Sequence, residues 1–541
     1  MRKIALLVLA ASACGSGAAA PIDPPVLTIT SPVRALVQGQ SGQVTVTGTV
    51  APGASGDVVK TVTVNDTAAT LNADGSFSAT ITVGAGTTLI QTVATDERGG
   101  AATDVRALQA GALKPVGSNI PSAVTAAMST DSFAKLSAAA GPLIKGLDLG
   151  KLVAPLQPLA SFGSTCLAQG SASVDDVKLG DIQVTLTPTA GGLMFRAELD
   201  AVKVPGHATY RAACLPTATT HFTVSANKVV VAGTLDVKPN GMAGFSTKIV
   251  RPDVQLTGFD LSASGLPGDI LDLIDFNGLV TSIVPSVAEL AMNPLFNKAL
   301  GALSGPQQLA VAGQQLSMQV VPSAIDFDAS GALLALDMKM AIAGSESSPG
   351  FVYTENGTPA LDPSHGFQVG IADDLANEML AELTATGKLD LALPVPGGLF
   401  DTAAIHMALP PSVSADASDG KLRVVLGDMV ASFMTGSNTV AKAAINAKLD
   451  FKVSPTTNGA GVAVQLGEPE IHINVLDDVQ NTTGFSDDTL AKAVSAVLGA
   501  QIDSISQLLV AVPLPSIDGI QVSNLSIDSD MGYVMVRGEF Q

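Results

Sequence analysis

The sequence predicts an α+β protein in which an N-terminal all-β sandwich precedes two tandem elongated halves. Apolar residues alternate with period two in the N-terminal stretch, and the order helix, antiparallel strands and helix occurs twice in the long remainder. A chain of 541 residues is also too long for one ordinary core. With 47% hydrophobic and 14% charged residues, the chain can bury large cores and is not a disordered polymer.

The charge balance and composition exclude several classes of function. Asp and Glu number 48 against 28 Lys and Arg, without a basic stripe, so binding to nucleic acid or to a bare anionic membrane by charge alone is disfavoured. Tryptophan is absent and aromatic residues make up 4% of the chain, which leaves few flat surfaces for stacking sugars or bases. The five His and three Cys form no pair at metal-binding spacing, so we expect no metal and no cofactor.

Residues 1–13 have the pattern of a secretory signal peptide. Two basic residues, Arg2 and Lys3, precede an apolar run that is about half as long as a bilayer-spanning helix requires. The segment from Ala11 to Cys14 resembles a bacterial lipobox, although lipoboxes usually carry Leu at the first of these positions. The resemblance implies lipidation of Cys14, whereas the alternative is ordinary cleavage at the same bond or after Ala20.

An exported and lipidated chain would be held at a membrane by its N-terminal acyl groups. Position 15 is Gly rather than the Asp that often retains such lipoproteins at the inner membrane, which favours the outer membrane, at its periplasmic face or at the cell surface. The other cysteines, Cys166 and Cys214, would lie where disulfides persist, so we expect them to be bonded.

Residues 25–108 alternate apolar and polar side chains between closely spaced turns, which predicts a β-sandwich of short strands. Val62–Asp66, Asp74–Phe77 and Ala94–Asp96 with Gly99 resemble motifs of bacterial immunoglobulin-like domains appended to secreted enzymes and adhesins. The resemblance implies a spacer or a module that docks a protein partner. The aspartates of these motifs could suggest calcium, but each is better explained as a turn residue that satisfies local backbone groups.

The first long half, residues 122–344, has the pattern of a helix, a strand meander and a second helix. Thr130 can cap a helix whose apolar residues fall on one stripe, and Pro142 would interrupt or kink it. Alternating strands follow between residues 177 and 237, and a second helical region covers about residues 269–303.

The second half, residues 345–541, repeats this order. Asp373 or Asp374 begins a helix, where the adjacent carboxylates are explained by capping and by the helix dipole, and Gly387 stands where a C-terminal cap belongs. Several strands are expected between residues 389 and 475, followed by a long helix over about residues 486–512.

Two segments carry a resemblance to a known family. The closing part of the chain contains Val512–Pro515, Gly519, Val522, Asn524 and Met531–Phe540. An internal segment, Val320–Phe327, runs into the extended stretch Leu334–Met340. With the repeated order of elements, these segments resemble the tubular lipid-binding superfamily typified by bactericidal/permeability-increasing protein. The resemblance implies two tandem elongated barrels of curved antiparallel sheet wrapped around long helices.

Two features depart from that family. The pair of cysteines lies nearer the start of the first half than the family's usual disulfide. Members that bind lipopolysaccharide carry a cationic tip, whereas the basic residues of the first half here, among them Lys178, Lys203, Arg211 and Lys228, are scattered. Capture of an anionic glycolipid by charge is therefore not implied.

The resemblance implies an apolar crevice in each half that shelters the acyl chains of a phospholipid or another acyl lipid. The candidate wall residues of the first half are Phe133, Leu136, Leu143, Ile283, Val287 and Leu290. Those of the second half are Leu375, Met379, Leu383, Val494 and Leu498. The alternative for each of these residues is ordinary core packing.

Two other classes of function are alternatives to lipid binding. Motifs of hydrolytic and nucleotide-dependent enzymes, such as G-x-S-x-G, the P-loop and H-E-x-x-H, are absent from the sequence, so we expect no enzymatic activity. A structural or adhesive surface lipoprotein, whose immunoglobulin-like module binds a partner, remains the alternative and predicts a filled core without an apolar tunnel.

Overall fold

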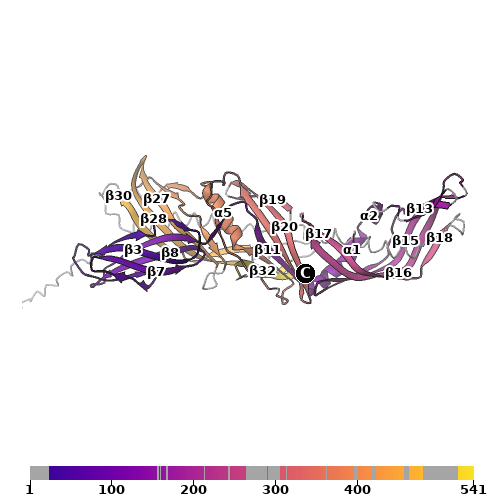
Figure 1. Cartoon of the computed structure of the whole chain (residues 1–541), viewed down its shortest axis with the longest axis horizontal. Helices are drawn as coiled ribbons and strands as arrows, with labels where there is room; N and C mark the ends of the chain where they lie inside the picture. The colour runs from indigo at the N-terminus through magenta and orange to yellow at the C-terminus, as the bar shows by residue number, and fades with distance from the viewer. Residues whose placement is uncertain are drawn as a thin grey trace, which may run out of the picture.

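The structure is a computed structural model that describes residues 23–154, 157–158, 160–165, 168–212, 214–241, 244–263, 289, 305–311, 313–360, 362–394, 400–415, 422–455, 462–478 and 522–540. These residues form an elongated molecule built mainly of β-sheet, with its N-terminal module at one end (Figure 1). The helices described are α1 Thr130–Lys145, α2 Leu149–Val153 and α5 Asp373–Ala385. The predicted signal peptide lies outside the described residues.

The predicted α+β class was wrong, because the described chain is predominantly β. Its longest described helix has 16 residues, so no long helix is present in this part of the chain for the sheets to wrap around. The strands are far longer than the usual length of about five or six residues. β15 Gly192–Ala212 and β16 Ala218–Pro239 have 21 and 22 residues and form one hairpin where the sequence pattern suggested several short strands. The helices expected at residues 269–303 and 486–512 lie outside the described residues, except for Glu289.

The predicted N-terminal sandwich is confirmed as two packed sheets. One sheet has the order β1–β3–β7–β6, and its strands are Val26–Ser31, Gly42–Ala51, Ser76–Val83 and Thr70–Leu71. The other has the order β2–β9–β8–β4–β5, and its strands are Leu36–Gln38, Ala101–Ala110, Gly86–Asp96, Val59–Val64 and Thr67–Ala68. The strict alternation of buried and exposed residues in β7 shows why period two predicted this module.

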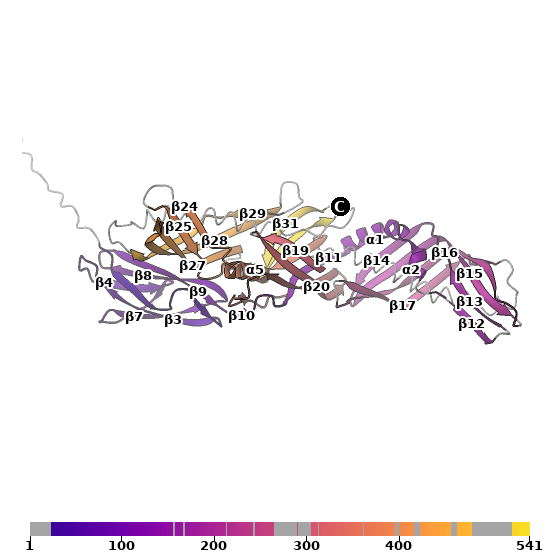
Figure 2. The same ribbon diagram turned by 90° about the horizontal axis from the view of Figure 1, so that it is seen from above.

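The first half forms a seven-stranded antiparallel sheet at the far end of the molecule (Figures 1 and 2). Besides β15 and β16, its strands are β12 Ala160–Thr165, β13 Ala168–Val174, β14 Ile182–Thr189, β17 Phe245–Thr257 and β18 Asp260–Ala263. α1 packs on β14, where the Ser137 hydroxyl accepts the Leu186 N–H at 2.9 Å. A Cβ at Gly141 would lie 2.4 Å from the Ile182 carbonyl oxygen, so glycine permits this close approach. α1 continues through Pro142 to Lys145, so the proline does not interrupt it.

The second half forms another seven-stranded antiparallel sheet. Its strands are β24 Leu391–Pro394, β25 Thr402–His406, β26 Ser412–Ser414, β27 Leu422–Thr435, β28 Asn438–Pro455, β29 Val462–Leu466 and β30 Glu470–Asp478. α5 begins at the predicted position and packs on β26, and Gly387 follows it with a φ of 67°.

A central sheet combines strands from distant parts of the chain. Its order is β19–β20–β21–β11–β23–β32–β31, and its strands are Gly305–Val311, Gln314–Asp328, Gly331–Ile342, Ile120–Ser129, Phe367–Ala372, Tyr533–Phe540 and Val522–Asp530. The two segments with family resemblance thus supply β20, β21, β31 and β32, whereas Val512–Pro515 and Gly519 lie outside the described residues. A short pair, β10 Ala112–Lys114 and β22 Phe351–Tyr353, lies next to this sheet and α5 (Figure 2).

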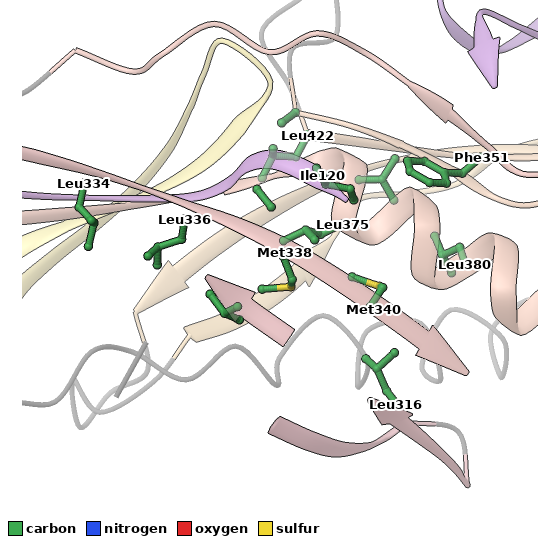
Figure 3. Packing of buried hydrophobic residues seen from close by; sticks show 14 of the residues in the cluster. Ile120, Leu316, Leu334, Leu336, Met338, Met340, Phe351, Leu375, Leu380 and Leu422 are labelled. Carbon is green, nitrogen blue, oxygen red and sulfur yellow. The ribbon is translucent and has the colours of Figure 1, made fainter. Parts of the chain in front are cut away.

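One hydrophobic cluster runs through both long halves and the central sheet. It includes Phe133 of α1, Leu193 of the first sheet, Leu336 of the central sheet, Leu375 of α5 and Ile445 of the second sheet. Figure 3 shows part of it, where the apolar residues of β21 follow one another along one strand face near α5. The N-terminal sandwich has a separate cluster of its own.

The N-terminal sandwich is docked on the sheet of the second half, and β8 and β9 contact β27, β28 and β30. An irregularity in the pairing of β27 with β28 directs Asp428 into this interface, where its side chain is almost fully buried. The Asp428 carboxylate accepts from Arg34 Nη1 at 2.9 Å, from the Ala35 N–H at 2.7 Å and from the Ala107 N–H at 2.9 Å. The module is therefore fixed to the second half by buried hydrogen bonds, in addition to its chain connection to β11 of the central sheet.

Candidate functional site

The predicted wall residues on α1 differ in how far they are covered. Phe133 is buried, and its ring centroid lies 6.3 Å from that of Phe327 on β20. Leu136 is half-buried and packs against the continuous hydrophobic cluster. The side chain of Leu143 lies outside the described residues. On this helix, Leu136 keeps apolar surface that a guest molecule could cover.

The wall residues on α5 show the same contrast. Leu375 and Leu383 are buried in the cluster, whereas Met379 is half-buried at its edge. Figure 3 places Leu375 and Leu380 of α5 near Met338 and Met340 of β21. The structure thus joins the described wall residues of both halves to one core. The remaining predicted wall residues lie outside the described residues, namely Ile283, Val287, Leu290, Val494 and Leu498.

A hollow of about 530 Å³ lies on the second half, against β24, β25 and β27. It is lined by Asp390, Leu391, Ala392, Ala404, Ile405, His406, Val430 and Ser432. Aliphatic side chains therefore make up most of its wall, with a polar edge where His406 Nδ1 lies 2.9 Å from Asp390 Oδ2. Its volume falls within the range of about 300–1,000 Å³ typical of small-molecule pockets. The sequence patterns did not indicate this hollow, because adjacent strands assemble it.

α5 also carries a row of buried carboxyl groups. Asp374, Glu378 and Glu382 follow at intervals of four residues, so they share one helix face, and each has at most 1% of its surface exposed. Burial raises the pKa of Asp374 to about 7, of Glu378 to about 8 and of Glu382 to about 7. The nearby cation of Lys114 lowers the pKa of Asp374 and Glu378, but burial has the larger effect.

The capping role predicted for the paired aspartates of α5 was wrong. The residue at the N-terminal cap is Ala372, and no side-chain hydrogen bond caps the helix. Asp373 Oδ2 instead accepts the Ala415 N–H at 2.9 Å, and Asp374 Oδ1 accepts the Thr354 N–H at 3.1 Å. The sequence did contain a signal, because α5 has carboxyl groups at four-residue spacing and no basic residue to pair with them.

Two histidines that are 14 positions apart in sequence meet on the first half. His207 and His221 are direct partners across β15 and β16, and their ring centroids lie 6.4 Å apart. Asp175 Oδ1 lies 2.6 Å from His207 Nδ1, and Asp175 Oδ2 lies 4.0 Å from His221 Nδ1. Within the described ranges, no group of three or more His, Cys, Asp or Glu is arranged to hold a metal ion.

The remaining predicted sites lie largely beyond the described ranges. Cys14 and Cys166 fall outside them. Cys214 is disulfide-bonded, and its pairing with Cys166 stays a prediction. No described helix is both long enough and apolar enough to cross a membrane.

Comparisons with known proteins agree with the module at the N-terminal end. Residues 25–111 match the family model described as glucodextranase, domain B. No curated protein matches the chain. This match supports the immunoglobulin-like module and leaves the two long halves without an assigned family.

Two solved structures resemble the chain over most of their length. A lipopolysaccharide binding protein is 13% identical, with a TM-score of 0.36, and the match covers 77% of this chain and 99% of that one. P47 of Clostridium botulinum E1 is 10% identical, with a TM-score of 0.29, and the match covers 77% of this chain and 98% of that one. At these scores the likenesses carry no conclusion about what this chain binds.

Proposed function

We propose that this chain is a non-catalytic lipid-binding or lipid-transfer protein that shelters acyl chains against the apolar interior of its two long halves. The observation that carries the proposal is the set of half-buried apolar side chains packed against the hydrophobic cluster that passes through all three seven-stranded sheets. Half-buried apolar side chains pack against this cluster in both halves, including Leu136 and Met379. Such side chains are partly covered by the protein and partly open to a guest.

The energetics favour an acyl chain as that guest. Burial of hydrocarbon contributes about 0.8 kcal/mol per methylene group, so one long acyl chain gains on the order of 10 kcal/mol before ordering costs. Met379 can adapt its shape to a flexible chain, because an unbranched thioether side chain has several low-energy conformers. The apolar hollow beside Asp390 and His406 offers a second place where a chain could lie next to a polar headgroup.

Native mass spectrometry tests this proposal directly. The delipidated full chain, incubated with phosphatidylethanolamine and phosphatidylglycerol vesicles and then separated from them, should gain the mass of about one or two phospholipids. Leu136→Asn and Met379→Asn should each reduce this uptake, because an amide at the crevice wall loses apolar contact and needs hydrogen bonds. Val37→Asn, a matched change at an exposed residue of the N-terminal module, should retain it. No uptake by the wild-type chain would overturn the proposal.

We further propose that the chain is an exported bacterial lipoprotein, anchored through Cys14 at the outer membrane on its periplasmic face or at the cell surface. The residues around Cys14 support this location. A mature N-terminus that carries acyl groups on Cys14, and whose processing is blocked by globomycin, is the expected result. An unacylated N-terminus would contradict the anchor without bearing on lipid binding.

A structural or adhesive surface protein is the second candidate. The docked N-terminal module supports it, because buried hydrogen bonds would hold such a module in a fixed orientation toward a partner. Under this alternative, the wild-type chain takes up no phospholipid in the experiment above.

A further inference from the structure

A segment that we name the strap, residues 111–119, joins the N-terminal sandwich to the central sheet and crosses α5. Within it, β10 pairs with β22, and β22 packs on α5. The Gly117 N–H donates to Glu378 Oε1 at 2.7 Å. The strap is thus hydrogen-bonded to the middle of the buried carboxyl row of α5.

The surroundings of the row supply little positive charge. Among the described groups with the largest effects on the row and its two tyrosine neighbours, Lys114 of the strap is the only base. Its ammonium lies 3.3 Å from the centroid of the Tyr353 ring. The other titratable groups in that set are Asp337, Glu346, Tyr353, Glu355, Asp373 and Tyr533. Of the other described strands that pack on α5, β11, β23 and β26 contain no titratable side chain, whereas β21 contains Asp337 and the exposed Lys339.

Glu378, like Glu382, is a poorly compensated member of the row. Its side chain has 0% of its surface exposed, and its Oε2 atom has no hydrogen-bond partner in the described structure. A buried carboxyl oxygen without a partner is costly, and the cost rises steeply when the group is charged. Burial therefore favours a neutral Glu378, and its effect is larger than that of the Gly117 hydrogen bond, which by itself favours the charged form.

We propose that the strap and the row Asp374, Glu378 and Glu382 form a pH-operated latch, in which the neutral row holds the strap on α5 and ionisation of the row loosens it. Carboxylates four residues apart on one helix face repel one another. Lys114 alone cannot compensate three such charges, so the ionised row gains by admitting water, and the strap is the segment hydrogen-bonded to its middle residue.

The direction of the response follows from the raised pKa values. The row is largely neutral below about pH 7 and ionised above about pH 8. Because the closed latch binds protons more tightly than the open one, closure is strongest in acid and weakens as pH rises toward 8. Since it depends only on α5 and its cover, the latch operates whether or not a lipid is bound.

Hydrogen–deuterium exchange of the full chain tests the latch. Protection of the strap and α5, corrected for intrinsic exchange at each pH, should fall by more than about tenfold between pH 5.5 and 8.5. Protection of β15 and β16, which lie far from the row, should change much less. Equal protection of the strap at both values of pH would overturn the proposal.

Two variants separate a titration effect from general destabilisation. Glu378→Gln keeps the side-chain size but cannot ionise, so it should reduce the pH dependence, whereas Glu97→Gln at an exposed position should leave it unchanged. Lys114→Met removes the cation but keeps the apolar stem, and it should move the loosening to higher pH. Loosening of the strap at lower pH in Lys114→Met would refute the latch. The same pH dependence in Glu378→Gln as in the wild-type chain would also refute it.

If Glu378→Gln does not fold, infrared difference spectroscopy of the wild-type chain still decides the matter. A protonated carboxylic acid band that persists above pH 6 and disappears by pH 9 supports the latch. Its absence at pH 6 contradicts the proposal.

Discussion

Two adjacent residues in β27 determine how the N-terminal module is attached. The pairing of β27 with β28 shifts between Leu426 and Met429, and Asp428 adopts a φ of 44°. A Cβ at Gly427 would lie 2.6 Å from the Ala107 Cβ, so glycine lets the two sheets approach. The irregularity aims a carboxylate at backbone N–H groups of the module.

Asp428→Ala should lower the free energy of unfolding by about 3–5 kcal/mol, because it leaves Arg34 and two backbone N–H groups without their buried acceptor. Urea denaturation monitored by circular dichroism measures this loss. Asp57→Asn breaks a more exposed pair with Arg98, at 3.3 Å, and should cost under about 1 kcal/mol. Equal losses in the two variants would show that burial of the Asp428 network is unimportant.

α5 is an example of a helix whose position was predicted and whose chemistry was not. Its start and the glycine after it follow from local signals, and the structure places both as expected. The burial of Glu378 depends on β22 and on the strap, whose Gly117 lies 261 positions away in the sequence. No pattern within the helix could show that its acidic face is covered.

Glu378→Gln should gain stability relative to the wild-type chain as pH rises. The pKa of Glu378 is about 8 in the folded chain, against 4.5 for the unperturbed group. The contribution of Glu378 to the free energy of unfolding is therefore fully present below about pH 4.5 and is lost as pH rises to about 8. The difference in free energy of unfolding should change by at most about 1.4 kcal/mol per pH unit in this window. Thermal denaturation from pH 5 to 8.5 measures it, and a constant difference would contradict the raised pKa.

The molecule as a whole is long because its three seven-stranded sheets follow one another, with the N-terminal module beside the last of them (Figures 1 and 2). The central sheet takes strands from residues 120–129, 305–342, 367–372 and 522–540. Both long halves therefore depend on the same sheet, and the buried Asp428 network makes the module part of the same body.

Small-angle X-ray scattering should therefore fit one rigid elongated particle in solution. The double variant Arg34→Ala and Asp428→Ala removes both sides of a buried ion pair, so we expect it to release the module and broaden the distribution of interatomic distances. A wild-type profile that requires a freely moving module would contradict the docking. A double variant with the wild-type profile would show that apolar contacts alone hold the interface.

The sequence by itself determined the local features of this protein. Period-two alternation identified the N-terminal sandwich, Thr130 and Asp373 marked the starts of two helices, and the resemblance segments fell on central strands. These signals act within a few residues, where backbone geometry and side-chain periodicity are set by neighbours in the chain. The overestimate of helix arose because short windows could not show that strands such as β15 and β16 continue for more than 20 residues.

Only the tertiary structure decided which groups meet. The pairing of β11 with β21 and β23, the burial of Asp428 and the cover over Glu378 all join residues more than 190 positions apart. Burial and electrostatic environment depend on every element that surrounds a side chain, and one chain segment does not contain that information. The division between covered and open apolar residues on α1 and α5 was decided in the same way, by packing against distant strands.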